Sequence, residues 1–100
     1  MARPRSTLQT LLEQLTSNVY FQPPNTLEME YPCIVYSRDG SDKKHANNRV
    51  YGHAKRYQVT VIDRNPDSNL PDAVEEQTFC QFDRYFAAGN LNHWVYTLFF

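Results

Sequence analysis

The stretch KRYQVTVIDR, residues 55 to 64, predicts the longest clear strand of the chain and anchors the prediction of its fold. Tyr57, Val59 and Val61 alternate with the residues between them, and this period of two is typical of a strand that packs one face on a core. The next four residues, Asn-Pro-Asp-Ser, predict a turn. We therefore expect the chain to leave the sheet after residue 64.

Further elements are expected on both sides of this strand. A second helix follows the turn, with Asp67, Ser68 or Asn69 as its cap and Pro71 in its first turn. A first helix is predicted near the start of the chain, because four leucines fall on one helical stripe and Ser6 or Thr7 can cap it. These leucines are Leu8, Leu11, Leu12 and Leu15.

Four shorter segments complete the expected sheet. They are a strand at 19–21 ended by two prolines, an apolar strand at 31–38 inside the sheet and covered on both faces, a strand at 82–86, and a closing strand at 93–100 after a Gly-Asn turn. The order predicts a single α+β domain over residues 1–100. We expect a four- to five-stranded mixed or antiparallel sheet with two helices packed on one face.

Residues 39–54 interrupt this pattern with a polar stretch. Val50 and Tyr51 are its only sizeable apolar residues, so we expect a long loop or excursion. Loops of this length in a compact domain are usually functional or disordered. The C-terminus, in contrast to this polar stretch, is apolar and ends on Phe99 and Phe100. We therefore expect it to lie in the core or under another subunit.

The charge is balanced in total, at −1, but not along the chain. Residues 38–56 carry +4 and residues 57–100 carry −4. Two interpretations are open. The two segments form solvated faces of a monomer, or the basic segment of one copy meets the acidic segment of the next in a head-to-tail contact.

The sequence offers few residues for chemistry. Three glycines, at 40, 52 and 89, cannot build a phosphate-binding loop, and the three histidines, at 45, 53 and 93, are too dispersed for a helical ligand pair. His93 with Asp83 or Cys80 would form a site only if the last hairpin aligned them. Asp63 and Asp67 are better explained as turn residues than as a general acid and base. We expect no catalytic site, no metal and no cofactor.

Compartment and nucleic-acid binding are constrained by composition. Cys33 and Cys80 stand alone and are expected to be buried thiols in a reducing compartment, and neither a signal peptide nor a membrane span is expected. Basic residues interleave with tyrosines at 43–57, but a pI near 6.3 argues against a dedicated nucleic-acid binder. A surface that lines a DNA passage is compatible with this weaker signal.

Four segments of the chain resemble a family of small proteins from long-tailed bacteriophages and prophages, the tail terminator, tail completion or minor tail proteins. These segments are NVYFQPP (18–24), YPCIVYSRD (31–39), RYQVTVIDRNPDS (56–68) and FDRYFAAGNLNHWVYTLFF (82–100). The resemblance covers nearly the whole chain, and YPCIVY and NLNH with the following aromatic strand are its most specific parts. It implies a non-enzymatic protein that forms a hexameric ring, caps the completed tail tube, stops its polymerisation and offers a joining surface to the head connector. Genomic DNA would pass through the bore without sequence-specific binding.

The resemblance and the charge pattern together lead to an expected set of contact residues and an expected location. Contacts between subunits are expected at Lys43, Lys44, Arg49, Lys55, Arg56, Asp67, Asp72, Glu75, Glu76, Phe99 and Phe100, and a DNA-passage lining at Lys43, Lys44 and Arg49. The expected location is the tail–neck junction of a virion assembled in the host bacterial cytoplasm. The alternatives are a head-completion or stopper protein of the neck, a small binding module, and a small hydrolase that uses His93 and Asp83.

Overall fold

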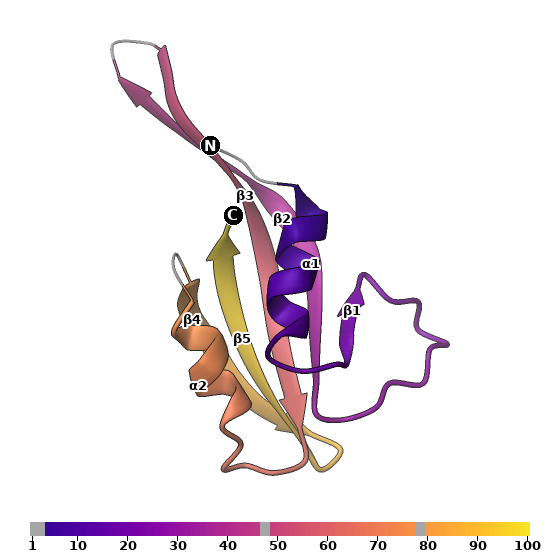
Figure 1. Ribbon diagram of the computed structural model, residues 1–100. Helices are drawn as coiled ribbons and strands as arrows, with labels where there is room; N and C mark the ends of the chain where they lie inside the picture. The colour runs from indigo at the N-terminus through magenta and orange to yellow at the C-terminus, as the bar shows by residue number, and fades with distance from the viewer. Residues whose placement is uncertain (1–3, 47–48, 78–79) are drawn as a thin grey trace.

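The computed structural model describes residues 4–46, 49–77 and 80–100, and side chains for 4–39, 55–77 and 80–100. These residues form a five-stranded mixed sheet with two helices, which confirms the predicted α+β fold. The elements are α1 (Arg5–Glu13), β1 (Val19–Phe21), β2 (Cys33–Ala46), β3 (Arg49–Asp63), α2 (Leu70–Glu75), β4 (Cys80–Ala88) and β5 (Leu91–Phe99). Both helices lie on the same side of the sheet (Figure 1).

The strands lie in the order β1-β2-β3-β5-β4. The short β1 runs parallel to β2, with Val19 opposite Ile34, and every other pair is antiparallel. β2 is therefore inside the sheet, as predicted, and β4 is an edge strand. The last two strands meet at Gly89 and Asn90, both of which have positive φ, so the predicted tight turn is confirmed.

The polar segment 39–54 is an excursion, but the prediction of a loop there is wrong. β2 and β3 continue through most of it as one antiparallel hairpin, with a bulge between Arg38 and Gly40. From Figure 1, this distal part of the hairpin projects away from the helices and from β4 and β5. The two strands pair through their backbones, and their polar sequence has no apolar alternation from which they could be recognised.

The core forms between the helices and one face of the sheet. The alternating residues of the predicted central strand, Tyr57, Val59 and Val61, are all buried there. Leu8 and Leu12 of α1 and Val74 of α2 cover them. The remaining members of the cluster are Ile34, Tyr36, Tyr96, Leu98 and Phe100.

The start of α1 differs from the prediction, whereas α2 has Asn69, one of the three expected cap residues, at its cap position and Pro71 in its first turn. α1 begins at Arg5 with Pro4 in the cap position, so neither Ser6 nor Thr7 caps it. Asn69 takes the cap position of α2 without a side-chain hydrogen bond, while Ser68 Oγ accepts a bond from the Leu70 amide at 3.2 Å. Proline at the start of each helix supplies the required φ without a side-chain cap.

The last residue of the aromatic end lies in the core, which is one of the two positions expected for it. Phe100 is 6% exposed within the core cluster, and its backbone pairs with that of Lys55, with the Phe100 N–H donating to the Lys55 carbonyl at 2.9 Å. Phe99 belongs to the opposite face of the sheet and is half-buried.

That opposite face, which we call the open face, carries no helix among the described residues. It holds Val35, Thr60 and Phe99, which are all half-buried. The prediction that the apolar run at 31–38 is covered on both faces therefore holds only in part on this side, where Cys33 is buried and Val35 is half-buried. On this same face Cys33, Ile62 and Val95 are buried, whereas Val35, Thr60 and Phe99 keep part of their surface exposed.

Candidate protein–protein interface

A groove of about 560 Å³ lies where the turn before α2, α2 itself, β4 and β5 come together. Its walls bring together side chains that lie far apart in the sequence. They are Pro66, Asp67, Ser68, Asn69, Pro71, Asp72, Glu75, Phe82, Tyr85, Trp94 and Tyr96. We call this the α2–β4 groove.

The floor of the groove is aromatic. Phe82 packs edge-on against Tyr96, with ring centroids 5.5 Å apart, and Tyr85 packs on Trp94 at 5.4 Å. Phe82 and Tyr85 remain 49% and 48% exposed, so their rings present accessible surface. Such rings attract apolar groups and cations over their faces.

The tyrosine hydroxyls of the floor are already bonded inside the chain. Tyr96 donates to the Pro71 carbonyl at 3.2 Å, and Tyr85 donates to Asn92 Oδ1. Burial, and then the charge of Glu75, raises the pKa of Tyr96 to about 12. The floor therefore offers ring surfaces and carries no charge of its own at neutral pH.

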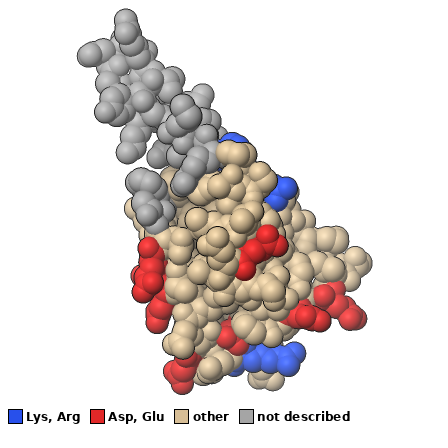
Figure 2. Space-filling model, in the orientation of Figure 1, with Lys and Arg blue, Asp and Glu red and all other residues tan. Residues whose placement is uncertain are grey.

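The rim of the groove is acidic. Asp67, Asp72 and Glu75 are exposed around the floor, and Glu76 is exposed next to them at the end of α2. Figure 2 shows acidic side chains on the side of the molecule that holds α2 in Figure 1, with others spread over the rest of the visible face. All four are predicted contact residues, and the structure brings three of them to one groove.

The turn before α2 is held by successive side-chain caps on the backbone. Asp63 Oδ1 accepts from the Asn65 amide, and Asn65 Oδ1 accepts from the Asp67 amide, both at 3.0 Å. The role of Asp63 as a turn residue is thus confirmed. Asp67 lines the groove, and its backbone N–H donates to the Asn65 side chain, so no described hydrogen bond shows the turn role expected of its own carboxylate.

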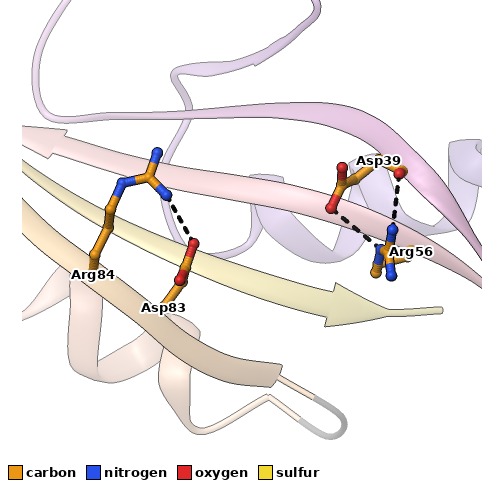
Figure 3. A network of polar contacts seen from close by, with 4 residues as sticks. All are labelled: Asp39, Arg56, Asp83 and Arg84. Atoms are coloured by element: carbon orange, nitrogen blue, oxygen red, sulfur yellow. Dashed lines mark hydrogen bonds and ion pairs between the residues drawn. The ribbon is translucent and has the colours of Figure 1, made fainter.

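β4 borders the groove and is exposed along its length. It pairs with β5 on one side, and no described strand lies on the other. Phe86 is 40% exposed and stacks on His93 of β5, with centroids 4.5 Å apart. A register shift between Phe82 and Arg84 leaves Asp83 without a pairing residue in β5, and its carboxylate is ion-paired with Arg84 at 2.9 Å (Figure 3).

The predicted basic contact residues lie elsewhere in the molecule. Arg56 Nε is 3.2 Å from Asp39 Oδ2, and Arg56 Nη2 donates to the Asp39 carbonyl at 3.3 Å, at the base of the projecting hairpin (Figure 3). Lys55 precedes Arg56 in β3, and its backbone exchanges hydrogen bonds with that of Phe100. The side chains of Lys43, Lys44 and Arg49 lie outside the described part, although their backbone belongs to the hairpin strands.

The predicted residues are therefore not one patch. The acidic members surround the groove, whereas the basic members follow β2 and β3 toward the far end of the hairpin. Phe99 is available in part on the open face, and Phe100 offers almost no surface to a partner because it is buried. The aromatic floor was not predicted, and its only signal in the sequence is the density of aromatic residues in the last two strands.

The residues considered for catalysis are engaged separately. The ring of His93 stacks on Phe86, and Asp83 pairs with Arg84. In the described part of the chain, His93 Nδ1 is buried without a hydrogen-bond partner, and neither His93 nor Asp83 lines the α2–β4 groove. Within the same residues, no group of three His, Cys, Asp or Glu side chains could hold a metal ion.

The two cysteines are free thiols. Cys33 is buried, as expected, and Cys80 is partly buried against the core. Burial raises the pKa of each thiol to about 11, with a smaller contribution from Asp63 at Cys33 and from Glu75 at Cys80. Both are therefore protonated at neutral pH and react slowly as nucleophiles.

Comparison with known proteins adds no assignment. No family model, curated protein or solved structure matches the chain. Among the described helices, none has the length and apolar character that a membrane crossing needs.

Proposed function

We propose that the protein is a tail terminator of a long-tailed bacteriophage, which forms a hexameric ring on the end of the completed tail tube. Its partners are further copies of itself, the tail tube protein and the head-completion or connector proteins. The proposed place of action is the tail–neck junction of the virion, after assembly in the bacterial cytoplasm. It acts by binding and not by catalysis.

The sequence resemblance is the first support for this proposal. The four segments that carry it are spread over β1, β2, β3, β4 and β5, so they form most of the sheet and are not confined to one surface motif. The resemblance therefore concerns most of the fold.

The observation that carries an assembly role is the exposed edge of β4. Monomeric proteins protect their edge strands with charge, irregularity or cover, because an open edge invites pairing with another chain. β4 has one bulge with the Asp83–Arg84 pair, yet it leaves Phe82, Tyr85 and Phe86 each at least 40% exposed. Exposed aromatic side chains of this size are typical of contact surfaces between proteins.

The proposed mechanism is occupancy of the tube end. A ring of this protein covers the surface on which the next ring of tube subunits would dock, and its other face has no complementary surface for a tube subunit. Growth of the tube therefore stops, and the free face joins the head connector. In this arrangement basic residues of the hairpin that do not contact a neighbouring copy would line the DNA passage, where charge attracts the phosphate backbone of any sequence.

Deletion of the gene in the phage tests this function. We expect tails of unregulated length that are not joined to heads, because nothing then caps the tube. Tails of normal length that merely fail to attach would contradict the terminator role and would indicate a head-completion protein instead.

A second variant tests the non-enzymatic role. His93→Ala is expected to retain ring assembly and infectivity, because the His93 ring makes a stacking contact in the protomer. Intact rings combined with lost infectivity would contradict the proposal and favour a catalytic role for His93.

A further inference from the structure

We infer that the α2–β4 groove is the receptor for the β2–β3 hairpin of a second copy of this chain. This inference rests on the proposed ring and names the surface through which adjacent copies would contact each other. The occupant is the distal hairpin, residues 39–55, and the surface that receives it is the acidic rim and aromatic floor described above.

The chemistry of the groove fits a basic occupant. Its rim carries the carboxylates of Asp67, Asp72 and Glu75, and its floor exposes the rings of Phe82 and Tyr85. A lysine or arginine gains from both, since a carboxylate pairs with its charge and an aromatic face attracts the cation. Because the tyrosine hydroxyls of the floor are bonded within the chain, the groove selects its occupant through the charge of the rim and the ring surface of the floor.

The hairpin has the complementary charge. Between residues 40 and 55 the sequence contains four basic residues and one acidic residue. The base of the hairpin also holds Arg56, but the Asp39 carboxylate already pairs with it. Residues 40–55 therefore carry a net charge of +3 in sequence, from Lys43, Lys44, Arg49 and Lys55 against Asp42.

The hairpin of a protomer cannot reach its own groove. Trp94, at the groove, lies beside Val61 of β3, whereas the hairpin end is at Arg49 of the same strand. At about 3.3 Å per residue, this separation is roughly 40 Å of extended chain. The hairpin also projects away from α2 and β4 (Figure 1). The contact must therefore join two molecules.

The dimensions suit a contact between neighbours. Residues 39–46 span roughly 26 Å at about 3.3 Å per residue, and the molecule is 23 Å wide across its two shorter axes. A projecting hairpin of this length can extend along the width of an adjacent copy. Because hairpin and groove are different surfaces, the contact is head-to-tail and generates a ring when its rotation closes.

A mixing experiment with two full-length variants tests this contact. One variant, Asp72→Lys with Glu75→Lys, reverses the rim, and the other, Lys43→Glu with Lys44→Glu, reverses the hairpin. Each alone juxtaposes like charges and is expected to self-associate at least about tenfold more weakly than the wild-type protein in sedimentation velocity. In an equimolar mixture, each hairpin again meets a groove of opposite charge. We therefore expect alternating assemblies of wild-type size, which also establishes that both variants are folded.

The matched control reverses two exposed carboxylates away from the groove, Glu28→Lys with Glu30→Lys. It has the same net charge as the rim variant and is expected to assemble like the wild type. If the rim and control variants assemble equally well, or if mixing restores nothing, the groove contact is wrong while the ring itself can stand. If the wild-type protein remains a monomer at every concentration and salt tested, both the contact and the ring are wrong.

Discussion

Replacing Phe100 by alanine removes a large buried ring while it leaves the backbone pairing with Lys55 in place. Phe100 is 6% exposed and belongs to the core cluster between the helices and the sheet. Truncation of a buried phenylalanine costs about 3–5 kcal/mol, from lost burial and the cavity that remains. We expect about 3 kcal/mol here, at the lower end, because a terminal site can partly collapse.

Urea unfolding at fixed protein concentration measures this loss, with high salt to suppress self-association. With a slope of about 1.5 kcal/mol per molar urea, the midpoint should fall by about 2 M. Phe99→Ala is the matched control, since Phe99 is half-buried on the open face, and its cost should be about 1.5 kcal/mol or less. An equal or larger cost for Phe99→Ala would refute the placement of the two C-terminal rings on opposite faces.

Three further predictions concern the buried amide, the thiols and the edge strand. Asn92→Ala should cost about 2 kcal/mol of unfolding free energy in urea titrations, because the backbone carbonyls of Asp63 and Arg64 lose their side-chain donor. Tyr85→Phe, which removes only the hydroxyl bonded to Asn92, should cost less, and equal costs would contradict this. Stability should fall as pH rises from 9 to 11, because the thiols of Cys33 and Cys80 have pKa values raised from 9.0 to about 11 in the folded state, so unfolding releases protons in this window. Thermal melts at several pH values measure this loss of stability. The Cys33→Ala variant should lose less stability than the wild type between pH 9 and 11, and an identical loss would argue against the contribution of the Cys33 thiol. Phe86→Ser should change the unfolding free energy by about 1 kcal/mol or less but weaken self-association in sedimentation velocity, and unchanged sedimentation would argue against an assembly role for the β4 edge.

The elements with a clear apolar period could be predicted from the sequence. The alternation at 57–61 and the leucine stripe of the first helix both correspond to buried residues, because each pattern matches the period of its element. The distal hairpin at 39–54 could not be found in this way, since Val50 and Tyr51 are its only sizeable apolar residues and they form no apolar alternation.

The groove was only half predictable. The acidic rim follows from the charge of residues 67–76, which the sequence displays directly. Its aromatic floor depends on the register that places Phe82 beside Tyr96 and Tyr85 beside Trp94. A bulge between Phe82 and Arg84 sets that register, and neither the bulge nor the placement of α2 over this end of the sheet has a local sequence signal.

Electron cryomicroscopy of the virion neck tests the proposed role most directly. The account predicts a six-fold ring of this chain between the end of the tail tube and the head connector, with each β2–β3 hairpin seated on the α2–β4 groove of the next copy. A two-fold dimer of this chain, or a tube end without it, would contradict the account.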